Sequence, residues 1–416
     1  MPLIIQKYGG TSVGDAARIK NVARRLLETH REGNRVVGVI SAMAGVTDNL
    51  LKLSREMSSD PTDRELDILL STGERAASAL TAMAINALGG KAISLTGAEA
   101  GILTDRNYNK ARIANISPRR IHELLAEDYI VLVAGFQGQS PEGDTTTLGR
   151  GGSDLTAIAL AGALNADACQ IFTDVDGVFT CDPRIVKDAA KVDEIAYDEL
   201  LEMAGAGSKV MQSRAVEFAK KFGVEFEVRS SFKPDSGTVA REEAPNMEEV
   251  VIRGISLDRK QAKLTVAGVP DKPGVAGRIF SMIAAHHIIV DMIVQSAPIE
   301  QKIDISFTIH EDELEDARKV LMPVVSEIQA NRLNTTSGST KLSVVGIGMR
   351  SHSGVAARFF ECLGKAGINI QLVSTSEIKI AVLVDGAQAD EAAQLIHTEF
   401  GLARLGPTLP ATRPLG

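Results

Sequence analysis

Tryptophan is absent from the 416 residues, and tyrosine and cysteine are scarce, with four and three copies. The cysteines, Cys169, Cys181 and Cys362, are far apart and odd in number. Such spacing makes neither a disulfide framework nor a cysteine metal site, so we expect a reducing, cytoplasmic setting. The seven histidines show no metal-ligand spacing, and the adjacent His286 and His287 are expected at a helix end. We therefore predict no metal ion held by the protein's own side chains.

Long apolar runs and an excess of positive charge are also missing. A membrane-spanning helix needs about 18 or more consecutive apolar residues, and no such run occurs. The apolar run in the opening MPLIIQKYGG is too short for a signal sequence. The formal net charge of −8 lacks the basic footprint of proteins that bind nucleic acids or anionic membranes. We therefore predict a soluble protein with neither partner, in which any phosphate is bound by local basic groups.

What the sequence does contain, up to about residue 230, is an alternation of short aliphatic runs with amphipathic helical patterns. Buried strands joined by helices predict an α/β fold, a three-layer αβα sandwich with a mainly parallel sheet. Ligands of such sheets bind beyond the carboxyl ends of the strands. The segments expected at these ends, and therefore at one crevice, are KYGG, SAMAG, FQG and TDVDG.

A polar, turn-rich stretch at about residues 230–250 interrupts this alternation, and an internal repeat follows it. Residues 264–296 resemble residues 342–376, with two extra residues in the second copy. The matched pairs are Gly274 and Gly354, Arg278 and Arg358, and Phe280 and Phe360. Each copy predicts a strand, a glycine turn, a helix, two strands and a helix, which is a ferredoxin-like βαββαβ unit.

These patterns divide a chain too long for one ordinary core into two or three domains. The predicted parts are an α/β domain at 1–232, a linker at 233–258, repeat modules at 259–335 and 336–402, and a disordered tail at 403–416. The tail is rich in proline and glycine and has no apolar period, which is typical of a disordered terminus.

The stretch KYGGTS follows the first predicted strand. Gly9 and Gly10 allow backbone N–H groups to approach an anion, the helix N-terminus after them favours negative charge, and Lys7 supplies a mobile positive charge. The alternative is a plain strand-to-helix turn with a surface lysine. Spacing alone leaves both open.

A second glycine-rich stretch, TLGRGGSD at 147–154, precedes an apolar helical pattern but lacks the Gly-Lys-Ser/Thr ending of a Walker loop. Ser153 is a good N-cap for that helix, and Asp154 suits its first turn. Capping explains neither Arg150 nor the pair Gly151 and Gly152. Because arginine offers a bidentate fork to a carboxylate or phosphate, we predict an anion site here.

Glu74 ends the segment STGE just before an apolar helical pattern. The serine–glutamate spacing fits a capping box, and the alternative is a carboxylate that attracts an ammonium group. The segment SAMAGVTD offers the hydroxyls of Ser41 and Thr47, or forms only a polar turn.

The segment TDVDGVFTCDPR at 173–184 is dense in turn residues and fits a solvated loop. Alternatively, its carboxylates orient magnesium or a ribose, and Arg184 meets a phosphate. These carboxylates belong to Asp174, Asp176 and Asp182. Lys209 opens another helical pattern, where a lysine opposes the helix dipole, so either a phosphate lies nearby or the lysine is simply exposed.

Taken in order, KYGGTSV, SAMAGVTD, STGE, TLGRGGSD, TDVDGVFTCDPR and SKVM resemble the motifs of the amino-acid kinase family, and within it those of the aspartate kinases. The two repeats resemble the paired ACT regulatory modules of the same family. The likeness extends over about residues 2–400. It implies transfer of the γ-phosphoryl group of MgATP to the β-carboxylate of L-aspartate, giving 4-phospho-L-aspartate and ADP on the way to lysine, threonine and methionine.

The resemblance also implies roles for individual residues. Glu74 would pair with the amino group of aspartate, Arg150 with its α-carboxylate, and Asp154 would position Lys7 at the transferred phosphoryl group. Further aspartate contacts would come from Ser41, Thr47, Gly151 and Ser153. The nucleotide would be surrounded by Lys7, Gly9, Gly10, Thr173, Asp174, Phe179, Asp182, Arg184 and Lys209. The family often has tyrosine at the position of Phe179, so a hydroxyl contact there is lost in this chain.

The implied chemistry agrees with the residue types. Phosphoryl transfer depends mainly on positioning and on neutralising charge. The β-carboxylate nucleophile is ionised at neutral pH, so no general base is needed. This accounts for the absence of histidine from every one of these motifs. The cofactors implied are ATP and Mg²⁺.

The ACT resemblance implies feedback inhibition by lysine and/or threonine. The implied effector positions are Asp271, Gly274, Val275, Ala276, Asp291 and Gln295 in the first copy and Asn369, Ile370, Ser376 and Glu377 in the second. Because Ile289 and Val290 stand where the second copy has Asn369 and Ile370, the two copies should bind unequally. The alternative is that the repeats only dimerise the enzyme.

Two further matters stay open. The assembly is expected to be a homo-oligomer, or to include a shorter regulatory chain that starts near Met247. Competing functions are another amino-acid kinase, acting on acetylglutamate, glutamate or a nucleotide, and a non-catalytic amino-acid sensor. The intact Lys7, Arg150, Asp154 and Asp182 argue against the sensor.

Overall fold

The computed structural model describes residues 1–208, 210–244, 251–350 and 352–403. They form two compact units. The first comprises Met1–Val178, Lys191–Ala204 and Lys209–Pro245, and the second comprises Phe179–Ala190, Gly205–Ser208 and Asn246–Gly416. Lys209 and Met247 lie outside the described residues. So does the predicted disordered tail, except for its first residue, Ala403.

An eight-stranded sheet forms the centre of the first unit, in the order β10-β12-β11-β9-β1-β2-β6-β3. Its strands are β1 (Leu3–Tyr8), β2 (Arg35–Ile40), β3 (Ala92–Leu95), β6 (Ile130–Ala134), β9 (Ala168–Thr173), β10 (Glu194–Ala196), β11 (Phe226–Ser230) and β12 (Thr238–Arg241). Every neighbouring pair is parallel except β11 and β12. The predicted mainly parallel sheet is confirmed.

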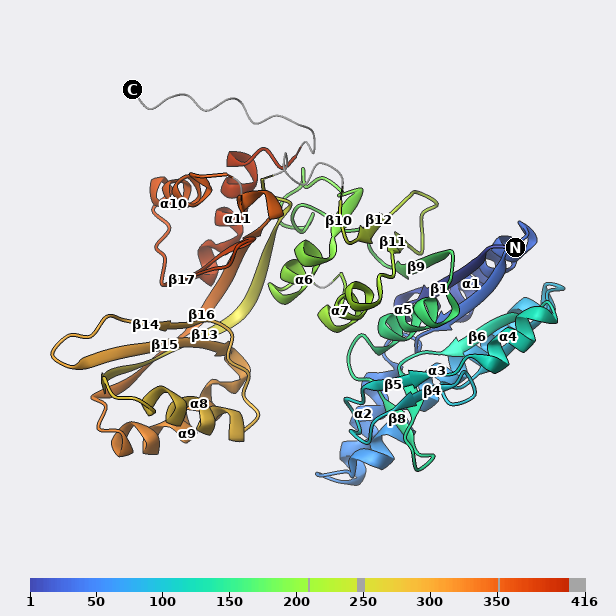
Figure 1. Cartoon of the computed structure of the whole chain (residues 1–416), viewed down its shortest axis with the longest axis horizontal. Coiled ribbons are helices and arrows are strands. Elements are labelled where there is room, and N and C mark those ends of the chain that lie inside the picture. Colours follow the sequence, from blue (N-terminus) through green and yellow to red (C-terminus); the bar gives the residue numbers. More distant parts are fainter. Residues whose placement is uncertain (209, 245–250, 351, 404–416) are drawn as a thin grey trace. The chain divides into compact units, whose positions relative to one another are not determined.

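Helices cover both faces of this sheet (Figure 1). On one face, α1 (Ala16–Arg31) and α3 (Asp63–Ala87) pack on a core that includes Tyr8 and Ile40. The other face is covered by α5 (Gly152–Leu164), which packs on β1 and on α7 (Ser213–Phe222). Because α5 contacts both a strand and a helix, it is apolar nearly all round.

The remaining helices of this unit are α2 (Val46–Met57), α4 (Arg119–Ala126), α6 (Tyr197–Gly205, ending in the second unit) and the 3₁₀ turn η1 (Gly10–Val13). Among the described residues of the whole chain, no helix is both long and apolar enough to cross a membrane.

A second, four-stranded sheet in this unit was not predicted. It has the order β5-β4-β7-β8 and consists of β4 (Ile102–Thr104), β5 (Ile113–Ile116), β7 (Gln137–Gln139) and β8 (Thr145–Thr147). The largely apolar stretch YIVLVAGFQG is divided between the two sheets, because Phe136 takes a left-handed φ of 70° between β6 and β7. This small sheet leads directly into the segment TLGRGGSD.

The second unit contains one six-stranded sheet, in the order β14-β15-β13-β16-β18-β17. Its strands are β13 (Gly254–Pro270), β14 (Ile293–Gln295), β15 (Lys302–His310), β16 (Arg332–Val345), β17 (Leu372–Thr375) and β18 (Lys379–Asp385). Both repeats follow the predicted order of strands and helices, but the long β13 and β16 run through both modules and join them into a single sheet.

The predicted linker at 233–258 is therefore wrong at both of its ends. Strand β12 belongs to the eight-stranded sheet, and β13 already begins at Gly254, which pairs with Val345. These two strands were missed in the sequence because both contain polar residues, which a strand can carry without leaving the sheet. The middle of the predicted linker, at 245–250, lies outside the described residues.

The helices of the repeats are α8 (Val275–Ala285) and α9 (Leu314–Glu327) in the first copy, which lie side by side in Figure 1, and α10 (Val355–Lys365) and α11 (Ala389–Glu399) in the second. Gly274 and Gly354 are the N-caps of α8 and α10, with φ of 93° and 89°. Matched arginines form matched ion pairs, Arg278 with Glu327 at 2.7 Å and Arg358 with Glu399 at 3.0 Å. The repeat read from the sequence is thus a structural one, and His286 caps the end of α8 as expected.

One segment of the predicted first domain belongs to the second unit instead. Residues 179–190 contribute Cys181 and Val186 to the apolar core of the second repeat, beside Phe359. Thr180 Oγ1 lies 3.0 Å from Nε2 of the buried His397 on α11. The predicted division at residue 232 missed this excursion, since only the folded packing shows which core buries a short apolar segment.

Candidate active site

Four predicted loop segments meet at the carboxyl edge of the eight-stranded sheet. Strands β9, β1, β2 and β6 are consecutive and parallel in the sheet. At their carboxyl ends lie TDVDG, KYGG, SAMAG and FQG, in the same order. Backbone hydrogen bonds join the loops: Gly9 N donates to Phe172 O at 3.1 Å, and Ser41 N donates to Tyr8 O at 3.1 Å. The predicted convergence on one edge is confirmed.

The glycine loop after β1 needs its glycines for close approach. A Cβ on Gly10 would lie 2.9 Å from the carbonyl oxygen of Ala42, and Ala44 N donates to Gly10 O at 3.2 Å. A Cβ on Gly9 would lie 3.4 Å from Lys7 Nζ. The loop therefore brings backbone within reach of the lysine ammonium group and interlocks with the SAMAG loop.

Lys7 of β1 and Asp154 of α5 form an ion pair on the α5 face of the sheet. Lys7 Nζ lies 2.5 Å from Asp154 Oδ1, and the two side chains are 10% and 13% exposed. Successive residues of a strand point to opposite faces, so Lys7 faces α5 while Tyr8 faces α1. Asp154 stands in the first turn of α5, as predicted. The pair fixes a positive charge at the carboxyl end of β1.

Glu74 lies in the middle of α3, which begins eleven residues earlier at Asp63. The predicted capping box is wrong, because the preceding DRELDILL is already helical and Ser71 Oγ donates within the helix to Ile68 O at 2.8 Å. Glu74 is 5% exposed. Its Oε1 accepts a hydrogen bond of 3.3 Å from Ala42 N, whereas Oε2 has no partner among the described residues. Burial raises the pKa of Glu74 to about 7.

The segment TLGRGGSD forms the N-terminal entry to α5. The N-cap is Gly151, in the left-handed region with φ of 68°, so the prediction that Ser153 caps the helix is wrong. A Cβ on Gly151 would lie 2.0 Å from Gln212 Cγ, which leaves room for glycine alone. Ser153 is buried in the first turn against Gly135, and Arg150 is exposed. The helix N-terminus and Arg150 together suit an anion.

The hydroxyl residues Ser41 and Thr47 are half-buried, at the end of β2 and in the first turn of α2. Ser41 precedes Ala42, whose backbone N–H donates to Glu74. The SAMAGVTD loop is thus tied to the Glu74 carboxyl group and is more than a surface turn.

The candidate nucleotide residues are distributed over both units. Thr173 is the last residue of β9 and Asp174 follows it, and Thr173 Oγ1 donates to Asp174 Oδ1 at 3.2 Å. Phe179, Asp182 and Arg184 belong to the second unit. The hydrogen bond from Arg184, 2.6 Å between Nη2 and Oδ2, lowers the pKa of Asp182.

No protein metal site emerges in the described part of the chain, where no three His, Cys, Asp or Glu side chains are grouped as ligands. Asp176 instead forms an ion pair with Lys233.

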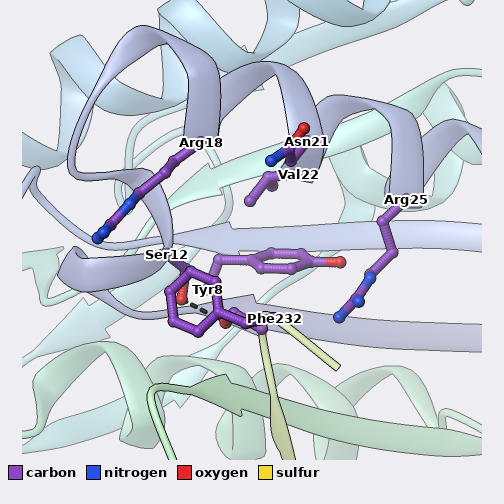
Figure 2. A pocket seen from close by; sticks show the side chains of 8 residues that line it. Tyr8, Ser12, Arg18, Asn21, Val22, Arg25 and Phe232 are labelled. Atoms are coloured by element: carbon purple, nitrogen blue, oxygen red, sulfur yellow. Dashed lines mark hydrogen bonds between the residues drawn. The ribbon is translucent and has the colours of Figure 1, made fainter. Parts of the chain in front are cut away.

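A small cavity of about 60 Å³ lies on the α1 face of the sheet, lined by Tyr8, Ser12 and residues of α1 (Figure 2). Its polar groups already have hydrogen-bond partners, among them Gln6 Oε1, which accepts from Tyr8 Oη at 3.1 Å. Ser12 Oγ and Ser231 Oγ are 2.5 Å apart, and Arg25 Nη1 donates to Ser230 O at 3.2 Å. Arg18 Nη1 donates to Thr11 O at 2.7 Å. These hydrogen bonds hold the glycine loop in place on the α1 face of the sheet. We assign no ligand to the cavity.

The first-copy effector candidates flank α8 and β14. Asp271, Gly274, Val275 and Ala276 form the turn from β13 into α8, and Gln295 ends β14. Asp291 precedes β14, where its carboxylate forms an ion pair with Lys341 of β16. This buried lysine, 5% exposed, also lies 3.6 Å from Asp258.

The second-copy candidates surround β17. Asn369 and Ile370 precede this strand, and Ser376 and Glu377 form the turn into β18. Glu377 lies 3.3 Å from Arg350. Met292, next to Asp291, and Leu372, the first residue of β17, share a small apolar cluster with Leu383. The two candidate sets therefore approach one another within the second unit.

Some residues that shape these sites were not singled out from the sequence. Asp67, Arg214 and Lys341 are charged residues in otherwise apolar or helical patterns. Asp67 and Arg214 bind the buried Thr147 and Leu148, and the buried Lys341 pairs with the partly exposed Asp291. The sequence indicates these residues only by a charged side chain at a position where the helix or strand pattern expects a buried one. A single sequence does not distinguish such a residue from an ordinary surface charge.

Comparison with known proteins agrees with this geometry. The model of the amino acid kinase family matches residues 2–230, and the ACT domain model matches residues 264–322 and 342–400. The chain therefore belongs to the amino acid kinase family. Its relatives over nearly the full length include the aspartokinase of Mycolicibacterium smegmatis, which is 48% identical over 408 residues, 97% of each chain. An aspartate kinase of Stutzerimonas stutzeri is 47% identical, over 97% of this chain and 98% of its own.

Solved structures give the same result. The structure of Escherichia coli aspartokinase III in complex with aspartate and ADP matches with a TM-score of 0.79 and 26% identity, over 95% of this chain and 99% of that one. The same protein with lysine and aspartate matches with a TM-score of 0.78.

Proposed function

We propose that this chain is a feedback-regulated aspartate kinase that uses MgATP to phosphorylate the β-carboxylate of L-aspartate. The observation that carries the proposal is the Glu74 carboxyl group, which is buried and leaves Oε2 without a partner in the described structure. A buried carboxylate is costly unless a cation joins it. The amino group of aspartate is such a cation.

The remaining residues of the crevice suit the other parts of the substrates. Arg150 offers a bidentate fork for the α-carboxylate, and Ser41, Thr47, Gly151 and Ser153 provide hydroxyl and backbone donors. Thr173 and Asp174 stand at the strand end beside the glycine loop, where we place the nucleotide. The second-unit residues Phe179, Asp182 and Arg184, and Lys209 outside the described residues, stay candidates for the same role.

In the proposed reaction, an oxygen of the β-carboxylate forms a bond to the γ-phosphorus, and the bond from that phosphorus to the β,γ-bridging oxygen breaks. ADP leaves with the electron pair, and no proton has to be moved. Lys7, held by Asp154 at 2.5 Å, neutralises charge on the transferred group. Gly9 and Gly10 add backbone N–H donors. Mg²⁺ enters with ATP and supplies further charge neutralisation.

Regulation is assigned to the second unit. We place lysine and/or threonine at the turn from β13 to α8, at Asp291 and Gln295, and at the equivalent positions around β17. The two copies differ in their side chains, Ile289 and Val290 against Asn369 and Ile370, so unequal affinity is expected. Pairing of these modules between chains would give a homo-oligomer, with a shorter chain starting near Met247 as the alternative assembly. A cytoplasmic location stays a prediction from the sequence.

The test is ADP formation by the purified chain with L-aspartate, compared with glutamate, acetylglutamate and no acceptor. Aspartate-dependent turnover that lysine, threonine or both reduce at sub-saturating aspartate is expected. Turnover with another acceptor alone would replace the substrate, and no turnover with any acceptor would favour an amino-acid sensor. Glu74→Gln should raise the KM for aspartate and leave that for ATP nearly unchanged.

A further inference from the structure

A buried carboxylate outside the reacting groups joins the two halves of the candidate aspartate site. Asp67 lies on α3 seven residues before Glu74, about two helical turns away. Its exposure is 0%, although aspartate is rarely so buried. A charged group in this position needs a compensating set of hydrogen bonds.

Those hydrogen bonds come from Thr147, the last residue of β8, and from Asn109 in the loop between β4 and β5. Asp67 Oδ1 accepts from Thr147 Oγ1 at 2.6 Å, and Oδ2 accepts from Thr147 N at 2.8 Å. Both oxygens lie 3.0 Å from Asn109 N. Thr147 is the first residue of TLGRGGSD, three residues before Arg150. Asp67 therefore holds the start of the loop that carries the arginine.

The carboxyl group of Asp67 faces two backbone N–H groups and a hydroxyl. An ionised carboxylate accepts from all three, whereas a protonated or amide group would turn one hydrogen toward the hydroxyl oxygen and make that hydroxyl the acceptor. Burial raises the pKa of Asp67, while the hydrogen bonds from Thr147 and Asn109 oppose that rise. Within the described part of the chain no ion pair reaches this carboxylate, so its compensation there comes from Thr147 and Asn109.

Other contacts hold the four-stranded sheet and the start of the loop from α3 and from α7. Arg75, next to Glu74, donates from Nε to Gln137 Oε1 at 3.1 Å and from Nη2 to Thr145 Oγ1 at 3.1 Å. Arg214 Nη1 donates to Leu148 O at 2.6 Å. These bonds hold β7, β8 and the second residue of the loop, whereas Asp67 holds its first residue from the helix of Glu74.

We propose that Asp67 is a positioning residue that sets the distance between Glu74 and Arg150, and thereby the affinity for the amino-acid substrate. Both residues lie on the rigid helix α3. Glu74 binds the ammonium group of the substrate, and Asp67, two turns earlier, fixes the position of the loop that carries Arg150. The inference rests on the proposed function, because it takes Glu74 and Arg150 as the groups that hold aspartate.

The main test is Asp67→Asn, which keeps the size of the side chain but replaces one acceptor oxygen by an N–H₂ group. We expect the KM for aspartate to rise roughly tenfold to a hundredfold, while the KM for ATP stays within about twofold. A cycle with Arg150→Ala should be strongly non-additive, because a loop without its arginine has nothing left to position.

Thr147→Val is the milder variant, in case Asp67→Asn fails to fold. It removes the hydroxyl bond to Asp67 and keeps the backbone bond. The matched control is Thr146→Val, which removes an equally buried hydroxyl that bonds Thr104 at 2.7 Å. The proposal requires a higher KM for aspartate in Thr147→Val than in Thr146→Val at similar melting temperatures.

Equal effects of the two threonine variants would overturn the proposal, as would additive effects of Asp67→Asn and Arg150→Ala, or parallel rises in both KM values. These outcomes differ from failure of the proposed function. In that case the wild-type chain itself would form no ADP with aspartate, or Arg150→Ala and Glu74→Gln would leave the KM for aspartate unchanged.

Discussion

Lys341 extends its ammonium group from the middle of β16 to the carboxylate of Asp291, a residue of the candidate effector site. The lysine is buried, with 5% of its side chain exposed, while Asp291 is 40% exposed. An internal cation thus already occupies a carboxylate that an amino-acid effector would approach with a cation of its own. The effector must share this carboxylate with Lys341 or displace it.

Replacing Lys341 by methionine should therefore strengthen inhibition. The half-inhibitory concentration of lysine is expected to fall roughly threefold to tenfold, the size of a lost partly exposed ion pair. The two aspartates left behind, Asp258 and Asp291, are 30% and 40% exposed and can be hydrated. Adding Asp291→Asn should abolish the gain. An unchanged or higher inhibitory concentration in a folded Lys341→Met enzyme would contradict the competition.

Asp154 should matter to catalysis through Lys7. Asp154→Asn removes the charge that holds the ammonium group at 2.5 Å, so kcat should fall roughly tenfold to a hundredfold, and Lys7→Ala should cost about a hundredfold or more. The double variant should be no slower than Lys7→Ala alone, because the two residues act as a unit. Multiplying losses, measured as kcat for ADP formation, would show that Asp154 acts independently of Lys7.

How far the sequence predicts this architecture depends on how local each signal is. The glycine loop after β1 and the acidic first turn of α5 are encoded within a few residues, and the structure confirms both. Parallel strands then bring the loops to one edge of the sheet, which the alternating pattern also predicts. For these parts, local sequence and fold rules were sufficient.

The missed parts depend on partners distant in the chain. Strands β7 and β8 are three residues long and polar, so no apolar pattern in the sequence predicts them, and they are recognised only by their pairing with each other. Residues 179–190 change units because Cys181 and Val186 find a core formed by residues far along the sequence. The capping-box prediction for STGE was wrong for another reason. The same serine–glutamate spacing occurs in a helix interior, and the helical residues before this segment show that it lies inside α3.

Gly151 provides a test of the loop geometry. Gly151→Ala combines a left-handed φ of 68° with a clash, since the new Cβ would lie 2.0 Å from Gln212 Cγ. We expect kcat/KM for aspartate to fall at least about tenfold, because the loop must move to relieve the contact.

The matched control is Gly89→Ala, at the end of α3, which has φ of 80° and nothing within 4 Å of the new Cβ. It should cost about 1 kcal/mol of stability through backbone strain alone and leave the KM for aspartate unchanged. Melting temperatures and KM values of both variants check this. Similar kinetic losses in the two would mean that strain, and not the contact with Gln212, governs the site.

The buried carboxyl group of Glu74 predicts a pH dependence of substrate binding. Burial raises its pKa to about 7, so the free enzyme carries a mixture of neutral and ionised Glu74 at neutral pH. If the ionised form binds the ammonium group of aspartate, the KM for aspartate should rise as the pH falls below about 7, approaching tenfold per pH unit. Glu74→Gln should give a KM roughly tenfold to a hundredfold higher that no longer changes over this range.

Stability supplies the control, with the opposite sign. Since the folded-state pKa of Glu74 lies above its usual value of 4.5, the folded free enzyme favours the neutral acid, and its stabilising contribution is lost as the pH rises through about 7. At about pH 8, Glu74→Gln should therefore melt no lower than the wild type without aspartate, and gain less when aspartate is added. A KM for aspartate that is flat between about pH 6 and 8 in the wild type, or a Glu74→Gln enzyme that aspartate stabilises equally well, would remove Glu74 from the binding site.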